Sequence, residues 1–110
     1  MDPVEAQMDA FNRRDLEQFM VCYDENVVME DGAGHVVMQG HDALRAFQER
    51  LFRQSPELHC QVLSQMRAGS YVVFDEYTTG LHAEGYPSEL HNIAVYRVDG
   101  NKITHFRFLM

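Results

Sequence analysis

The sequence predicts a single α+β domain over residues 1–110, with helices in the first half and an antiparallel β-meander in the second. Apolar residues recur at helical spacing in the first half, until Ser55 and Pro56 stop the pattern. Beyond Pro56 the pattern changes to that of strands separated by short turn segments. The chain of 110 residues has the size of one domain, and 45% hydrophobic content suffices to bury a core.

Capping signals predict the first two helices. Asp2 and Glu5 form a capping box at the start of the first helix, and Asp15 and Gln18 form another at the start of a shorter one. The second helix is expected to bury an apolar face made of Leu16, Phe19, Met20 and Tyr23.

Two short extended segments should separate the second helix from a third. Residues 24–26 have turn composition, and residues 27–30 and 35–39 read as short strands. Helical spacing then returns at Asp42, whose carboxylate complements the dipole of the third helix, and ends before Pro56.

Four longer strands follow, and turn residues separate them. Asp99 and Gly100 give the strongest hairpin signal, because an Asp-Gly pair tolerates the positive φ angles of tight turns. The predicted strands are residues 58–67, 71–80, 86–98 and 102–110. Strands of this length must twist, so we expect a curved sheet with the helices packed on its concave face.

The third long strand is apolar on both of its faces. The alternating residues are Ile93 and Val95 on one side and Ala94, Tyr96 and Val98 on the other. An antiparallel sheet that is apolar on both faces is covered on both, and a second copy of the chain is the simplest cover. The sequence therefore predicts a homodimer through the outer face of the sheet.

The composition indicates which partners the protein can bind and in which compartment it is expected. Seventeen acidic residues against nine basic ones give a net charge of −8, which disfavours nucleic acid and anionic membrane surfaces. The chain has no apolar run long enough to cross a bilayer and no signal-peptide pattern, so we expect a cytoplasmic protein. Cys22 and Cys60 lie far apart in apolar stretches and read as buried thiols in a reducing compartment.

The order of these elements and four local motifs resemble a known superfamily. The motifs are residues 10–16 (AFNRRDL), 23–31 (YDENVVMED), 40–47 (GHDALRAF) and 95–103 (VYRVDGNKI). The chain resembles the nuclear transport factor 2-like superfamily, in its SnoaL-like and ketosteroid isomerase-like branch. The resemblance covers nearly the whole chain. It implies a cystatin-like roll, in which three N-terminal helices and a strongly curved sheet form a cone around a deep apolar pocket, and it implies dimers through the outer sheet face.

The resemblance also implies a catalytic base. Ketosteroid isomerases carry a carboxylate just after the first short strand, and the matching position here is Asp31. The alternative is that Asp31 only opens the turn that continues with Gly32. The oxyanion donors of those enzymes match Gln7 and Ala94, and only the former can donate from its side chain. The donor pair is therefore incomplete in this chain, which argues against the isomerase reaction of those enzymes.

Other residues are expected to line the pocket. Alternation along the strands places Asn92 on the same face as Tyr96, and the resemblance places Glu76 inward as well. The alternative for Glu76 is a solvated position near the strand end. Phe106 and Phe108 share one face of the last strand, as pocket wall or as core. The six histidines lack the spacing of a metal site, and no phosphate-binding glycine loop is present, so we expect neither metal nor cofactor.

Two kinds of function fit these residues. One is a cofactor-independent isomerase, cyclase or hydrolase that acts on a small apolar or amphipathic molecule, with Asp31 as general base. The other is a ligand-binding or dimerisation module of the same fold without chemistry, as the missing donor pair suggests.

Overall fold

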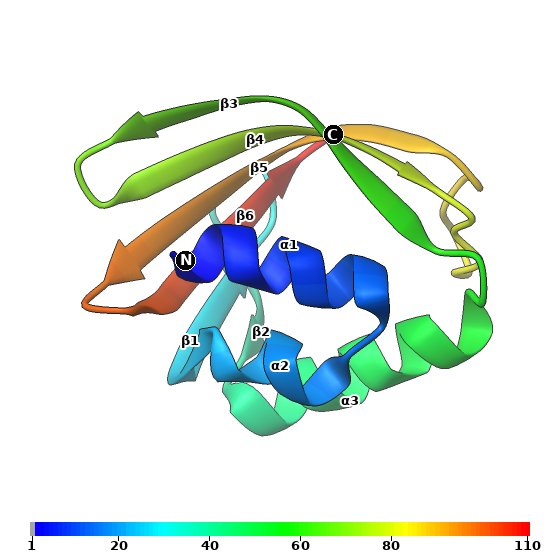
Figure 1. Cartoon of the computed structure of the whole chain (residues 1–110), viewed down its shortest axis with the longest axis horizontal. Coiled ribbons are helices and arrows are strands. Elements are labelled where there is room, and N and C mark those ends of the chain that lie inside the picture. The colour runs from blue at the N-terminus through cyan, green and yellow to red at the C-terminus, as the bar shows by residue number, and fades with distance from the viewer. Residues whose placement is uncertain (1) are drawn as a thin grey trace.

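The computed structural model describes residues 2–110, which fold into three helices on one side of a six-stranded sheet (Figure 1). The helices are α1 (Pro3–Arg13), α2 (Leu16–Val21) and α3 (His41–Gln54). The strands are β1 (Tyr23–Glu30), β2 (Val36–Gln39), β3 (His59–Ala68), β4 (Tyr71–Thr79), β5 (Leu90–Asp99) and β6 (Lys102–Leu109). The predicted α+β class is confirmed.

Side-chain caps begin the first two helices where the sequence predicts them. A carboxylate oxygen of Asp2 accepts from the backbone N–H groups of Val4 and Glu5 at 2.9 and 3.1 Å. Asp15 accepts in the same way from Gln18 at 3.1 Å. These bonds satisfy donors that have no partner inside the helix. The chain between α1 and α2 turns through Arg14, whose φ of 60° ends α1 in the left-handed conformation.

The prediction that residues 24–26 form a turn, with Tyr23 still helical, is wrong. α2 ends at Val21, and Tyr23 already begins β1. The reason is long-range pairing, because β1 lies parallel to β6 and Tyr23 is the partner of Ile103. Local turn composition at residues 24–26 is overridden by these distant backbone partners.

The sheet has the order β2-β1-β6-β5-β4-β3. All neighbouring strands are antiparallel except the pair β1 and β6. The predicted third long strand begins at Leu90 and not at residue 86, because the chain from Gly80 to Glu89 forms a loop. Gly80 and Gly85 adopt positive φ angles in this loop, which an extended strand does not allow.

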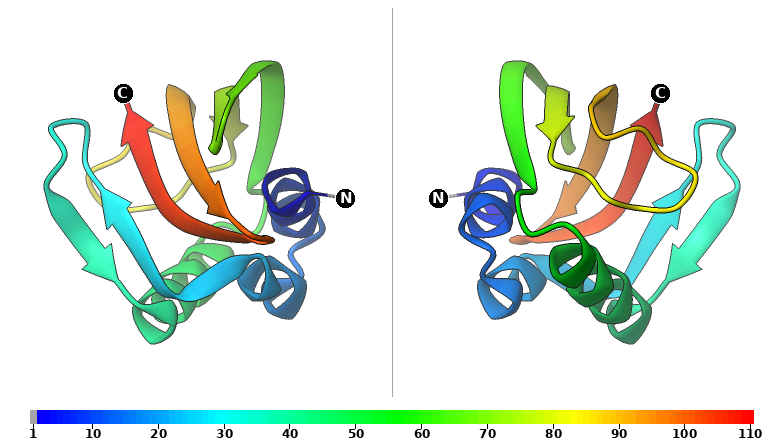
Figure 2. Two further views of the ribbon diagram at one scale, coloured as in Figure 1. Left: turned by 90° about the vertical axis from the view of Figure 1, so that its left-hand side faces the viewer. Right: turned by 90° about the vertical axis from the view of Figure 1, so that its right-hand side faces the viewer.

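Bulges help to bend the sheet around the helices. The register shifts between Val62 and Ser64 in β3 and between Arg97 and Val98 in β5, and such irregularities increase local twist. In both views of Figure 2 the strands curve around the side on which α1 and α3 lie. The predicted packing of helices on a concave face is therefore observed.

The core lies between the concave face and the helices. Its largest cluster joins α1, α2 and α3 to the inner positions of the strands, with Phe74, Tyr96 and Ile103 at 2% exposure or less. A smaller cluster of Phe52, Leu58 and Leu81 closes the other end of α3. Within residues 2–110, no helix is both long enough and apolar enough to span a membrane.

Candidate functional site

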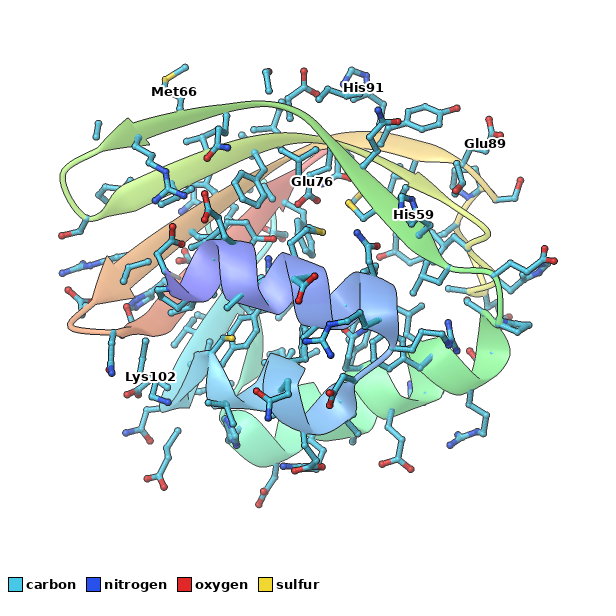
Figure 3. All side chains as sticks on the ribbon, viewed as in Figure 1. His59, Met66, Glu76, Glu89, His91 and Lys102 are labelled. Carbon is cyan, nitrogen blue, oxygen red and sulfur yellow. The ribbon has the colours of Figure 1, made fainter. Side chains whose placement is uncertain are left out.

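Four polar side chains lie buried together on the concave face. Glu76 on β4 is 3% exposed and its Cα partner across the strands is Asn92 on β5, which is 6% exposed. Tyr96 lies four residues further along β5, so it shares their face. Gln7 approaches from α1 and is 2% exposed. Figure 3 shows Glu76 on the helix side of the sheet.

Hydrogen bonds connect these residues into one chain that ends at Glu76. The Tyr23 hydroxyl donates to Oε1 of Gln7 at 2.9 Å, and Nε2 of Gln7 donates to the Tyr96 hydroxyl at 3.3 Å. The Tyr96 hydroxyl donates to Oε2 of Glu76 at 3.3 Å, while Nδ2 of Asn92 donates to Oε1 at 3.1 Å. Both carboxylate oxygens of Glu76 thus have a donor, as a buried carboxylate requires.

The environment makes Glu76 a weaker acid than an ordinary glutamate side chain. Burial raises the pKa of Glu76 to about 7, although the hydrogen bonds from Asn92 and Tyr96 act in the opposite direction. The effect of burial on the pKa is larger than that of the two hydrogen bonds, because the donors, Asn92 and Tyr96, carry no charge. Such a carboxyl group can both take and release a proton near neutral pH.

The neighbouring acids do not titrate in that range. Burial raises the pKa values of Tyr23 and Tyr96 well above their usual range, and the negative charge of Glu76 adds to both effects. The Cys60 thiol has its pKa raised to about 12, also mainly by burial. Cys60 is therefore a poor nucleophile, and Glu76 is the group in this cluster that changes charge near neutrality.

Asp31 lies apart from this cluster, in the turn between β1 and β2. Its Oδ1 accepts from the backbone N–H groups of Ala33 and His35 at 2.9 and 3.0 Å, and its side chain is 45% exposed. The hydrogen bond from the backbone N–H of His35 is the main reason that the pKa of Asp31 lies below its usual range, and the bond from the N–H of Ala33 lowers the pKa further. This is the geometry of a turn-stabilising aspartate. Its role as a general base stays a prediction.

Aromatic rings extend the site along β6. Phe106 stacks on Tyr96 with ring centroids 6.3 Å apart and an angle of 18°. Phe108 contacts Phe106 edge to face at 5.6 Å and is only part-buried, although it packs against the core. The structure thus brings together Gln7, Glu76, Asn92, Tyr96, Phe106 and Phe108, and leaves Asp31 outside.

Two residues of the concave side were not singled out from the sequence. Tyr23 was assigned to an apolar helix face, but its hydroxyl bonds to Gln7. Gln48 on α3 is 3% exposed, and its Nε2 has no hydrogen-bond partner within residues 2–110. The sequence did hold a signal for the burial of Gln48, because it lies at helical spacing between Leu44 and Phe52 on the same face of α3.

Two surface clefts lie elsewhere. A cleft of about 390 Å³ runs between α1, α2 and the β5–β6 turn, and one of about 310 Å³ lies beside it; both include Val21 and Lys102. Neither is lined by Gln7, Glu76, Asn92 or Tyr96, although Tyr23 from the start of the hydrogen-bond chain lines the second cleft. No group of three or more His, Cys, Asp or Glu side chains within residues 2–110 is placed to hold a metal ion.

Several solved structures share this fold. An uncharacterized cystatin-fold protein from Novosphingobium aromaticivorans is 23% identical with a TM-score of 0.87, over 98% of this chain and 95% of that one. A candidate polyketide cyclase from Sinorhizobium meliloti is 15% identical with a TM-score of 0.80, over 96% and 92%. TerC, co-crystallised with polyporic acid, is 16% identical with a TM-score of 0.78, over 98% and 88%. At these identities the likeness establishes the fold alone.

Sequence comparison adds the family. No curated protein matches the chain. Residues 4–106 match the SnoaL-like domain, a range that runs from the start of α1 into β6 and includes the whole Glu76 hydrogen-bond chain. The resemblance inferred from the four motifs is thereby confirmed, and the chain belongs to the SnoaL-like domain family.

Proposed function

We propose that the concave face binds a small apolar or amphipathic molecule and that Glu76 transfers a proton on it without a cofactor. The observation that carries the proposal is a buried carboxyl group with a pKa of about 7, held by Asn92 and Tyr96. A base is most effective when its pKa lies near the working pH, and positioned acid–base groups contribute about 10²–10⁴-fold in rate.

The reaction begins at a carbon acid, a C–H group next to a carbonyl. The C–H bond breaks, its proton passes to a carboxylate oxygen of Glu76, and the electron pair moves to the carbonyl oxygen as an enolate. Return of the proton to a different carbon gives isomerisation. Attack of the enolate carbon on a second carbonyl within the molecule gives cyclisation, and the alkoxide formed there takes the proton back from Glu76. Both routes return Glu76 to its starting state.

Part-buried apolar side chains support an opening beside this site. Met29, Met38 and Phe108 pack against the core cluster, yet each keeps partial exposure. They belong to β1, β2 and β6, which adjoin at one edge of the sheet. Methionine and phenylalanine give an adaptable apolar lining. Two proteins of this fold carry matching descriptions, a candidate polyketide cyclase and TerC with polyporic acid.

Glu76 and Asp31 are the two candidate bases. Asp31 is half exposed and has a lowered pKa, so at neutral pH it is a weak base already engaged by two backbone donors. Glu76 is buried and has a raised pKa, which favours proton uptake. We therefore assign the transfer to Glu76 and use Asp31 as the matched comparison.

Deuterium exchange into β-tetralone, a bicyclic ketone with acidic C–H groups, tests the proposal. Exchange is followed by NMR in deuterated buffer with the wild type, Glu76→Gln and Asp31→Asn. We expect Glu76→Gln to lower the protein-catalysed rate by about 10²-fold or more and Asp31→Asn to change it less than about twofold. The reverse pattern would assign the base to Asp31. Binding without exchange in the wild type would favour the non-catalytic ligand-binding module.

We also propose that the protein is a homodimer through the outer sheet face. Leu63 and Met66 are 50% and 66% exposed there, and Val73, Ile93 and Val95 are only part-buried in the single chain. These side chains place an apolar patch on the face opposite the helices. Sedimentation of the wild type at micromolar concentration should give a dimer, and Val95→Glu a monomer; a monomeric wild type would refute this.

The free, buried Cys22 and Cys60 support the expected cytoplasmic location.

A further inference from the structure

Gln48 is the one residue within residues 2–110 that carries a buried side-chain nitrogen or oxygen atom without a hydrogen-bond partner. It is 97% buried, given its 3% exposure, and the atom without a partner is Nε2. Enclosing an amide donor without an acceptor is unfavourable, and native structures contain few such groups. An apolar residue of similar length would avoid this cost, so the missing partner calls for an explanation.

Gln48 lies on the buried face of α3, the face that packs toward the concave side. Leu44 and Phe52 lie one turn before and one turn after it, and both are buried, at 2% and 8% exposure. Leu44 belongs to the larger core cluster and Phe52 to the smaller one, so Gln48 lies where the two clusters meet. In both views of Figure 2, α3 lies across the concave side of the sheet.

Two polar groups therefore reach the concave side from different walls, Glu76 from the sheet and Gln48 from α3. The Glu76 carboxylate accepts, whereas Nε2 of Gln48 can only donate. A ligand that satisfies Gln48 must carry an acceptor oxygen. An uncharged ketone oxygen fits better than a carboxylate, because Glu76 and the net charge of −8 oppose an anion.

We propose that Gln48 is a specificity-determining residue that donates from Nε2 to the carbonyl oxygen of the bound molecule. This inference rests on the proposed function, since it needs a ligand on the concave face. Gln48 selects ketones over hydrocarbons of the same shape, and its donor stabilises the oxygen on which negative charge develops when Glu76 removes the proton.

Paired probes test the donor. β-Tetralone carries the acceptor oxygen, and its methylene analogue replaces that oxygen by a carbon of similar size. We expect the wild type to bind the ketone about 5-fold more tightly, as one net hydrogen bond allows, and Gln48→Met to bind the two alike. Proton–nitrogen NMR should show the Gln48 side-chain amide shifting with the ketone alone. Gln54→Met, at an exposed glutamine on the same helix, is the control.

Thermal unfolding without ligand gives a second readout, in which Gln48→Met should gain stability although it loses the preference for the ketone. Gln48→Met removes an unsatisfied donor, so its melting temperature should rise by about 4 °C while the ketone preference is lost. A lower melting temperature, an unchanged ketone preference in Gln48→Met, or a Gln48 amide that neither probe perturbs would each overturn the inference. Failure of the proposed function is separate, because it appears as undiminished exchange in Glu76→Gln with the ketone preference intact.

Discussion

The substitution Glu76→Gln should change the pH dependence of stability by an amount that follows from burial. The folded pKa of Glu76 is about 7, against a usual value of 4.5 in the unfolded chain. Because the folded pKa is raised, the folded state binds the proton more tightly, and stability is fully present below pH 4.5 and lost as pH rises through 7. Each tenfold change in acidity is about 1.4 kcal/mol, so the loss is about 3 kcal/mol by pH 8.

Urea unfolding from pH 4.5 to 8.5 measures this effect in the wild type and in Glu76→Gln. The variant carries a neutral amide that resembles the protonated acid, so it should lack the loss between pH 5 and 8. Groups shared by both proteins, including the six histidines, cancel in the difference. The free energy of unfolding of the variant relative to the wild type should therefore rise by about 3 kcal/mol across this range. A difference that stays flat within about 0.5 kcal/mol would show that Glu76 is solvated and would refute the reasoning.

Two further substitutions have matched controls. Tyr96→Phe removes a donor to Glu76 and the acceptor of Gln7, so it should raise the pKa of Glu76 in NMR titration. It should also lower the free energy of unfolding by about 1–3 kcal/mol. The control is Tyr77→Phe, which removes an exposed hydroxyl bonded to Glu89 and should lower the free energy of unfolding by less than about 0.5 kcal/mol. A Cβ at Gly80 would collide with the backbone of Glu57, whereas one at Gly100 meets nothing within 4 Å, and both residues have positive φ. Gly80→Ala should therefore cost more than about 3 kcal/mol by urea unfolding and Gly100→Ala about 1 kcal/mol, and equal costs would contradict the predicted collision.

Local signals predicted most of the fold because they act over a few residues. The caps at Asp2 and Asp15 and the Asp99-Gly100 turn were placed correctly for this reason. The start of β1 was missed because Tyr23 pairs with Ile103, eighty positions away in the chain, and no local periodicity encodes that contact. The start of β5 was placed too early because Tyr86, a residue typical of strands, follows Gly85, whereas residues 86–89 still belong to the loop.

The candidate site was only partly predictable for a similar reason. Alternation along a strand is enough to place Asn92 and Tyr96 on one face, and both are buried there. The chain from Tyr23 through Gln7 to Tyr96 joins three separate elements, so no spacing in the sequence reveals it. Asp31 carries a strong turn signal, and the structure shows the bonds that such a turn makes. Gln48 differs from a solvated glutamine only through the helix face on which it lies.

The direction of the hydrogen bonds decides what each polar group on the concave side can do. The Tyr23 proton is directed to Gln7, and the Tyr96 proton to Glu76, so neither hydroxyl is free to stabilise an oxygen of a ligand. Tyr96 instead acts on Glu76 together with Asn92, because their hydrogen bonds favour its charged form in a place where burial disfavours it. The resemblance located the oxyanion donors at Gln7 and Ala94, but Gln7 is engaged by the tyrosines and Ala94 has no donor. A donor without any partner is the one best able to bind an enolate oxygen, and within residues 2–110 the buried side-chain atom of this kind is Nε2 of Gln48.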